Sequence, residues 1–96
     1  MDQNQLLKTY RKQILAAARK NGAYEVRVFG SVARGDARPD SDIDFLVKLE
    51  PGRSLLDLAR FLRELEEILG RNVDVVTEAG LRPRIRSQVL EEARPL

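Results

Sequence analysis

The segment Tyr24–Leu49, YEVRVFGSVARGDARPDSDIDFLVKL, determines the fold expected for this sequence. Apolar and polar residues alternate on both sides of its centre, first up to Phe29 and again over residues 42–49, as they do in half-buried strands. Between the two strands, residues 30–41 are rich in Gly, Asp, Arg and Ser. This composition predicts a short helical turn followed by a loop.

Helical periodicity surrounds this segment on both sides. Apolar residues recur every three or four positions over residues 5–20, 55–69 and 81–93, which predicts three amphipathic helices. Asn21-Gly22 and Gly70 are expected to stop the first two, because Gly and Asn are common where helices end. Further expectations are a capping box from Ser54 and Asp57, Pro83 in the first turn of the last helix, and a buried stripe of Leu81, Ile85 and Val89 on that helix.

A third strand is expected over residues 72–77, where Asp74 interrupts a run of valines. The order of elements is then α-β-(α)-β-α-β-α, an α/β (α+β) arrangement in which helices flank a small mixed sheet. A chain of 96 residues without an internal repeat or a linker is expected to form one domain, residues 1–96.

The residue types that are absent restrict the chemistry. The sequence contains neither His nor Cys, which excludes the usual zinc sites, Ser–His and Cys–His catalysis, and disulfides. A metal must then be a hard cation held by carboxylate oxygens, and a base must be Asp, Glu, Lys or Tyr. The lack of Cys and of a signal-like apolar run leads us to expect a cytoplasmic protein, and no stretch approaches the roughly 20 apolar residues of a membrane span.

Two carboxylates on the strand over residues 42–49 are the first candidate site residues. Asp42 and Asp44 are expected on the same face with their Cα atoms about 6–7 Å apart, while Ile43, Phe45 and Val47 anchor the opposite face in the core. Carboxylates this close repel each other, and a cation between them relieves the repulsion. Solvent-facing acids on an exposed strand are the alternative. Lys48, on the same face, either contacts phosphate or pairs with a carboxylate.

Asp74 is the third acidic candidate. Burying an unpaired carboxylate in an apolar strand costs several kcal/mol, so this residue needs a partner, a metal or an edge position. If its strand lies beside the strand that carries Asp42 and Asp44, Asp74 completes a cluster of three carboxylates. An edge strand with Asp74 in water is the alternative.

Gly30-Ser31 follows the first strand directly and is a candidate phosphate site. Gly permits close approach of another molecule, and a strand that runs into a helical turn presents backbone N–H groups and here the Ser hydroxyl. Arg34 lies one turn further on and Arg38 is near, so guanidinium groups can brace a triphosphate. An ordinary helix N-cap is the alternative.

Together these residues resemble the signature of the polymerase-β-like nucleotidyltransferase superfamily. In GSVARGDARPDSDID, ten residues separate Gly30-Ser31 from the Asp42-x-Asp44 pair, as in that signature. The resemblance is closest to the minimal nucleotidyltransferases and covers essentially the whole chain, including the Val-Asp-Val-Val strand and the Leu-Arg-Pro-Arg-Ile-Arg segment. It implies the polymerase-β palm-like nucleotidyltransferase fold.

The resemblance also implies a role for each candidate residue. The Gly30-Ser31 pair would bind the β- and γ-phosphates of a nucleoside triphosphate, expected to be ATP, with Arg34 beside it. Asp42, Asp44 and Asp74 would hold two Mg²⁺ ions, and Asp74 would also help to deprotonate the acceptor hydroxyl. Two metals stabilise both the attacking and the leaving oxygen of an in-line phosphoryl displacement, which agrees with the expected carboxylate cluster.

The acceptor is expected to be small or to be brought by a partner protein. Larger members of the superfamily carry additional domains that bind tRNA, DNA or an antibiotic, whereas one helix follows the third strand here. In minimal nucleotidyltransferases the partner is commonly a HEPN-domain ribonuclease toxin, and AMP is added to a tyrosine of that toxin. The resemblance therefore implies a type VII-like antitoxin, and the sequence leaves its oligomeric state, whether a homo- or a hetero-oligomer, open.

Other functions are less favoured by the sequence. An antitoxin that neutralises its partner by binding alone has no need of the Gly-Ser pair and three Asp. Nucleic-acid binding through Arg82, Arg84 and Arg86 lacks an aromatic stacking platform. Tyr10 and Tyr24 lie in hydrophobic periodicities, so we expect them to pack in the core rather than to be self-modification sites.

Overall fold

Helices and strands alternate along residues 2–96, the part of the chain that the computed structural model describes. The elements in chain order are α1 (Gln3–Thr9), α2 (Arg11–Lys20), β1 (Ala23–Phe29), α3 (Gly30–Arg34), β2 (Ile43–Leu49), α4 (Leu55–Leu69), β3 (Val73–Thr77), α5 (Pro83–Glu92) and β4 (Arg94–Pro95). The α/β order expected from the sequence is confirmed, with the first helix divided in two and a short strand added at the end.

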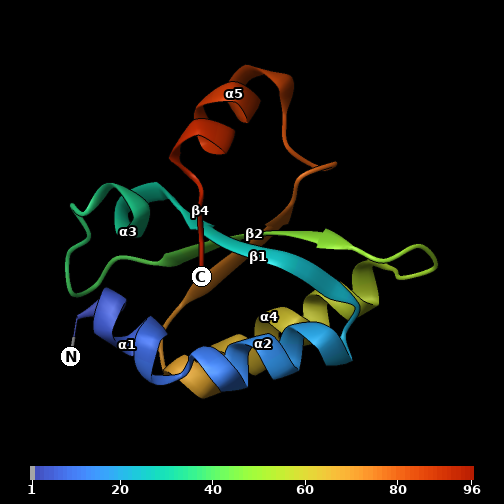
Figure 1. Ribbon diagram of the computed structural model, residues 1–96, viewed down its shortest axis with the longest axis horizontal. Coiled ribbons are helices and arrows are strands. Elements are labelled where there is room, and N and C mark those ends of the chain that lie inside the picture. The colour runs from blue at the N-terminus through green and yellow to red at the C-terminus, as the bar shows by residue number, and fades with distance from the viewer. Residues whose placement is uncertain (1) are drawn as a thin grey trace.

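The strands form one mixed sheet in the order β3-β2-β1-β4 (Figure 1). β1 runs antiparallel to β2 and to β4, whereas β2 and β3 are parallel and are joined by α4, the kind of crossover that parallel strands need. In this register Asp44 of β2 lies opposite both Phe29, the last residue of β1, and Asp74 of β3. The sheet therefore brings the candidate residues of three segments to one place.

Helices cover both faces of the sheet (Figure 1). α2 and α4 lie on one face, where Phe45 and Phe61 are fully buried. α5 lies on the other face, where Leu46 is fully buried against Leu81 and Val89. Alternate residues of a strand point to opposite faces, so β2 is buried on both sides and holds its polar residues on a rigid support.

The boundaries of α4 and α5 follow the expected capping chemistry. Ser54 and Asp57 form the predicted capping box, in which the Ser54 side chain accepts a hydrogen bond from a backbone N–H and the Asp57 side chain accepts one from the Ser54 N–H. Gly70 ends α4 in the left-handed conformation, with a φ of 64°. Pro83 is the first residue of α5, where its missing N–H costs nothing.

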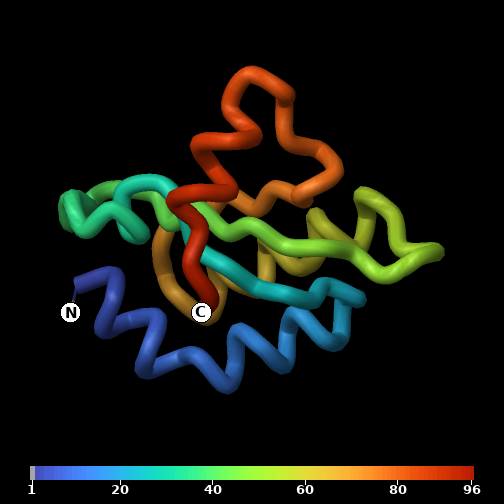
Figure 2. Tube along the Cα trace, turned by 45° about the horizontal axis from the view of Figure 1, so that its top comes forward, coloured from blue at the N-terminus to red at the C-terminus, as the bar shows by residue number. Residues whose placement is uncertain are grey.

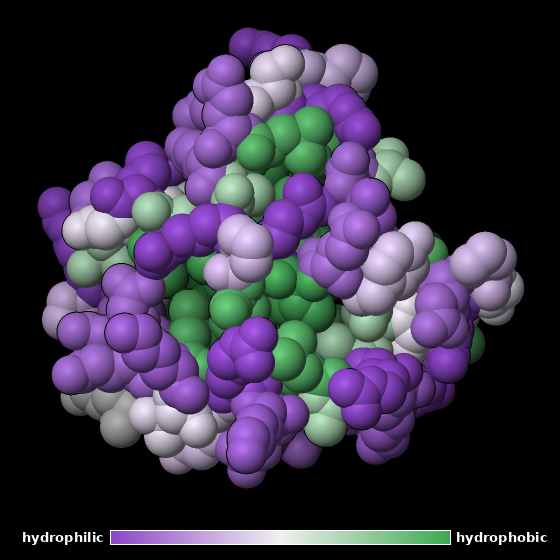
Figure 3. Space-filling model, viewed as in Figure 1, coloured by the Kyte–Doolittle hydropathy of each residue, from purple (hydrophilic) through white to green (hydrophobic). Residues whose placement is uncertain are grey.

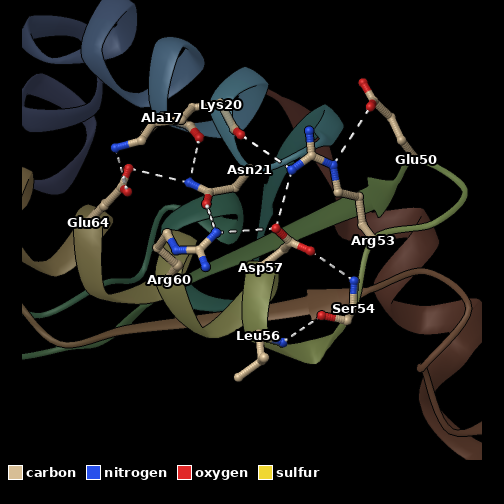
Figure 4. A network of polar contacts seen from close by, with 10 residues as sticks. All are labelled: Ala17, Lys20, Asn21, Glu50, Arg53, Ser54, Leu56, Asp57, Arg60 and Glu64. Carbon is tan, nitrogen blue, oxygen red and sulfur yellow. Dashed lines mark hydrogen bonds and ion pairs between the residues drawn. The ribbon is translucent and has the colours of Figure 1, made fainter.

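Asn21 connects α2 to α4 (Figure 4). It ends α2 and is fully buried. Its side-chain amide donates hydrogen bonds to the Ala17 carbonyl at 2.9 Å and to Glu64 Oε2 at 3.3 Å, while Arg60 donates to Asn21 Oδ1 at 3.5 Å. Buried amides are stable only when hydrogen-bonded in this way. The predicted helix stop is thus also the joint between two helices.

The helix expected over residues 5–20 begins earlier and is divided. α1 starts at Gln3 and is capped by Asp2, and Tyr10 separates α1 from α2 with φ of −104° and ψ of 14°. The apolar spacing continues across this break because both helices contribute buried residues to the same core. Periodicity alone therefore could not reveal the division.

The prediction that Tyr24 and Ile85 are buried is wrong. Tyr24 is 43% exposed and Ile85 is 45% exposed, whereas Tyr10 packs against the core as expected. β1 is irregular between Tyr24 and Arg27, with Glu25 at a φ of 49°, and Tyr24 borders a cavity of about 420 Å³ instead of the core. β4 was not predicted, because two residues that include a proline carry no strand pattern.

The end of the chain returns to the edge of β1 (Figure 2). Between this end and the N-terminal helices, apolar side chains remain visible on the surface (Figure 3), and a groove of about 160 Å³ there is lined partly by Leu7, Val28 and Leu96. Within residues 2–96, no helix is long and apolar enough to cross a membrane.

Candidate active site

The sheet register places Asp44 and Asp74 side by side. They are directly opposite each other in the parallel pair β2–β3, so both project from the face that α5 partly covers. Asp42 lies just before β2, two residues from Asp44, and is exposed. Asp74 is also exposed, because β3 is an edge strand, and Asp44 is half-buried. β3 is thus the edge strand of the alternative interpretation, and it also lies beside β2, so Asp74 is exposed at an edge and directly opposite Asp44.

The electrostatics of Asp44 reflect this crowding. Burial raises the pKa of Asp44 to about 6, and the negative charges of Asp74 and then Asp42 contribute in the same direction. Arg34 opposes the increase. Like-charged carboxylates resist ionising together, so this site favours either a proton or a cation.

Gly30 lies against Asp44. Its φ is 71°, and a Cβ atom at this position would lie 2.4 Å from Asp44 Oδ2, closer than any side chain tolerates. Glycine therefore allows the Gly30-Ser31 turn to approach the carboxylate without backbone strain and without a shift of the Asp44 side chain. Ser31 is the next residue of α3 and is partly buried. The predicted phosphate turn and the predicted metal ligands are thus adjacent.

Arg34 is at the end of α3 and is engaged by two acids. Its guanidinium contacts Asp36 at 3.3 Å and Glu92 of α5 at 3.0 Å. Hydrogen bonds to Glu92 and to Asp36 raise the pKa of Arg34 above its ordinary value. The guanidinium is exposed, and it lies close enough to the acid cluster to oppose the increase in the Asp44 pKa.

Glu92 is the site residue that sequence reasoning missed. Its Oε2 accepts a hydrogen bond from the Gly30 N–H at 3.3 Å, and its Oε1 accepts from Arg34. Burial raises its pKa, but hydrogen bonds from Arg34, Gln88 and Gly30 outweigh burial and leave the pKa below its ordinary value. No local pattern marks this residue, because its partners lie about 60 positions earlier in the chain.

The donor atoms of the three aspartates are of the type that Mg²⁺ prefers. All their donor atoms are carboxylate oxygens, which hard divalent cations prefer, and the repulsion around Asp44 is the kind that a cation relieves. With the side chains as they stand, no three acidic residues among residues 2–96 are arranged to hold a metal ion. The carboxylates would therefore have to turn towards an ion as it binds.

A shallow, polar cavity of about 610 Å³ adjoins Asp42. Its lining residues are Asp40, Ser41, Asp42, Glu66, Gly70, Arg71 and Asn72. The cavity is large enough for a side chain of another molecule to approach the acid cluster from the side of α4.

Basic residues outside the site have other partners. Lys48 pairs with Glu25 at 2.9 Å and with Glu78 at 3.9 Å, so it contacts carboxylates, but not those of the candidate site. Arg86 donates to the Glu78 carbonyl at 2.6 Å, while Arg82 and Arg84 are exposed. The arginine segment thus does not form one free basic surface.

A mixed sheet that holds facing carboxylates beside a Gly-Ser turn and an arginine is the arrangement of a nucleotidyltransferase, an enzyme that transfers nucleoside monophosphates. The family description "Nucleotidyltransferase domain" matches residues 11–96, and the chain belongs to that family. Its resemblance to the minimal nucleotidyltransferases is also confirmed, since a solved structure provisionally described as one shares 55% identity and a TM-score of 0.87 and covers 100% of this chain and 97% of the other.

Two further proteins are similar to this chain, one in sequence and one in fold. The chain is 41% identical over 86 residues to the protein adenylyltransferase MntA of Thermococcus cleftensis, covering 84% of this chain and 87% of MntA. A crystal structure of a toxin–antitoxin with AMP-PNP has a TM-score of 0.74 at 22% identity and covers 88% of this chain and 69% of the other, which shows a shared fold. Both proteins are similar to this chain over most of its length.

Proposed function

We propose that this enzyme transfers AMP from ATP to a hydroxyl group of a partner protein and releases pyrophosphate. The observation that carries the proposal is the contact of the Gly30 turn with Asp44, which itself faces Asp74. This arrangement would set the phosphates of a nucleotide directly beside three carboxylates. ATP is supported by the relative named a protein adenylyltransferase and by the AMP-PNP of the structure with the same fold.

The proposal assigns a role to each group of residues in the site. The Gly30 N–H, the Ser31 hydroxyl and the Arg34 guanidinium bind the β- and γ-phosphates. Asp42, Asp44 and Asp74 hold two Mg²⁺ ions, which when bound neutralise the charge that develops on the phosphate oxygens.

The transfer itself is an in-line displacement. The acceptor oxygen forms a bond to the α-phosphorus, and the bond from that phosphorus to the oxygen of the β-phosphate breaks. Asp74, which is exposed at the edge strand, accepts the proton of the acceptor hydroxyl. Because β3 is an edge strand, an acceptor can reach this carboxylate without displacing part of the fold.

The acceptor in this proposal is a tyrosine of a HEPN-domain toxin, so that the chain acts as an antitoxin. The support is the name of the relative MntA and the toxin–antitoxin structures with the same fold. Leu55 and Leu56 are 80% and 75% exposed, and adjacent large apolar side chains of this kind are suited to a protein contact. The proposal includes a cytoplasmic location, where ATP is available.

Labelling with α-³²P-ATP and Mg²⁺ tests the proposal. The protein is incubated alone and with the product of its neighbouring gene, and Asp44→Asn is compared with Glu67→Gln, which removes an exposed acid that neither is a proposed metal ligand nor lines the cavity beside Asp42. We expect label on the partner, and loss of roughly 99% of it in Asp44→Asn, because even residues that only orient a metal ligand contribute about 10- to 100-fold to activity. The control Glu67→Gln should change the labelling little. Tight binding of the partner with no label on any protein would reject transfer and favour neutralisation by binding.

A further inference from the structure

One carboxylate engages two of the groups to which the proposed function assigns phosphate binding. Glu92 Oε2 accepts from the Gly30 N–H at 3.3 Å, and Glu92 Oε1 accepts from Arg34 Nη1 at 3.0 Å. Gln88, one turn earlier on α5, donates to the same Oε1 at 3.4 Å and holds the side chain in this position. A carboxylate and a phosphate accept hydrogen bonds from the same donors, since both are oxyanions.

The position of Glu92 is electrostatically unfavourable apart from its hydrogen bonds, of which only that from Arg34 comes from a charged group. The side chain is 17% exposed, and the Gly30 to which it binds lies against the Asp44 carboxylate. A negative charge beside an acid cluster is stable only because the Gly30 N–H and the Arg34 guanidinium compensate for it. If a triphosphate took those donors, Glu92 would face both the phosphates and the aspartates with only the neutral Gln88 amide as a donor.

We propose that Glu92 is an internal anion that occupies the phosphate site of the nucleotide-free enzyme and competes with the incoming triphosphate. Nucleotide binding then requires the Glu92 side chain to leave the Gly30 N–H and Arg34. Glu92 therefore lowers the affinity for nucleotide and keeps the Gly30 turn and Arg34 in place while the site is empty. This inference rests on the proposed function, because it takes Gly30 and Arg34 as phosphate ligands.

The fold allows this movement at low cost. Glu92 is the last residue of α5, and the helix is anchored to the sheet by Val89 on its buried side and by Leu81, which lies two residues before the helix. The following strand β4 pairs with β1 through Arg94 and Pro95. A rotation of the Glu92 side chain can thus release the site while the backbone on both sides stays attached.

Nucleotide binding to Glu92→Gln tests the competition. Gln keeps the size of the side chain and removes its charge, and Glu91→Gln is the matched control because Glu91 is the adjacent, exposed acid on the same helix. Calorimetric titration uses a non-hydrolysable ATP analogue with Mg²⁺. We expect Glu92→Gln to bind about three- to tenfold more tightly than the wild type, as follows from removing one partly screened like charge, and Glu91→Gln to bind like the wild type.

The outcomes separate this inference from the proposed function. Unchanged or weaker binding in Glu92→Gln, with normal binding in the wild type and Glu91→Gln, would overturn the competition and leave the proposed function intact. No nucleotide binding by any of the three proteins would reject the proposed function and this inference with it. An NMR measurement on the wild type needs no variant: the analogue should shift both the Gly30 amide and the Glu92 carboxyl resonance, and a shift of Gly30 alone would also overturn the competition.

Discussion

At the scale of single residues, Gly30 makes the clearest demand on side-chain identity. Both its left-handed backbone and its contact with Asp44 oppose a side chain at position 30. Gly52, with a φ of 87°, has a left-handed backbone too, but the space around it is open. We expect Gly52→Ala to lose about 1–2 kcal/mol of unfolding free energy from backbone strain alone. Gly30→Ala should lose more, because its Cβ would clash with Asp44 Oδ2, and it should also lose AMP transfer.

Urea unfolding of the two variants, followed by the labelling assay, separates the two causes. The excess cost in Gly30→Ala measures the close approach of the turn to the carboxylate. Equal costs in the two variants, with transfer retained in both, would mean that Gly30 is needed for its backbone angle only.

The candidate site was predictable at this scale where the chemistry lies in one motif. Gly30-Ser31 and the Asp42–Asp44 pair stand in one short segment, and alternation along a strand is enough to assign the acids to one face. Glu92 was not predictable, because its contact with Gly30 depends on where α5 crosses the sheet. The position of α5 on the sheet is decided by the packing of Val89 against Leu46, and these two residues are distant in sequence.

At the scale of elements, the fold depends on how α2 meets α4. We expect Asn21→Ala to lower the unfolding free energy by about 1–3 kcal/mol, because it removes two side-chain hydrogen bonds, to the Ala17 carbonyl and to Glu64, each worth about 0.5–1.5 kcal/mol. The Ala17 carbonyl keeps the Asn21 backbone N–H and Glu64 keeps Lys20 as a partner. Gln13→Ala, on the exposed face of α2, is the control and should change it little. Thermal unfolding of both variants measures the effect, and equal midpoints would show that apolar packing alone joins the helices.

Element prediction succeeded where capping and periodicity agree and failed where the backbone departs from a regular pattern. α4 has both signals, and its bounds are those expected. The break at Tyr10 and the irregularity at Glu25 leave the apolar spacing nearly unchanged, so the sequence pattern does not report them. β4 forms only because α5 returns the chain to the edge of β1.

At the scale of the whole molecule, the acid cluster opposes folding. The pKa of Asp44 is about 6 in the folded protein, above its ordinary value of 3.8, so the folded state binds this proton more tightly than the unfolded chain does. Above pH 6 the ionised Asp44 therefore costs stability, and the cost declines as the pH falls from 6 towards 4. The crowded carboxylates of a cation site thus lower the stability of the fold while no cation is bound.

Asp44→Asn should consequently stabilise the fold while abolishing transfer. Without Mg²⁺ at pH 8 we expect the variant to be more stable by about 1 kcal/mol, a value reduced for solvent screening because Asp44 is only half-buried. The difference should shrink between pH 6 and pH 4. Mg²⁺ should raise the unfolding temperature of the wild type and leave that of the variant nearly unchanged. Thermal unfolding across this pH range, with EDTA and then with Mg²⁺, measures all three effects. A wild type more stable than Asp44→Asn at pH 8 in EDTA would show that the carboxylates are not crowded in solution.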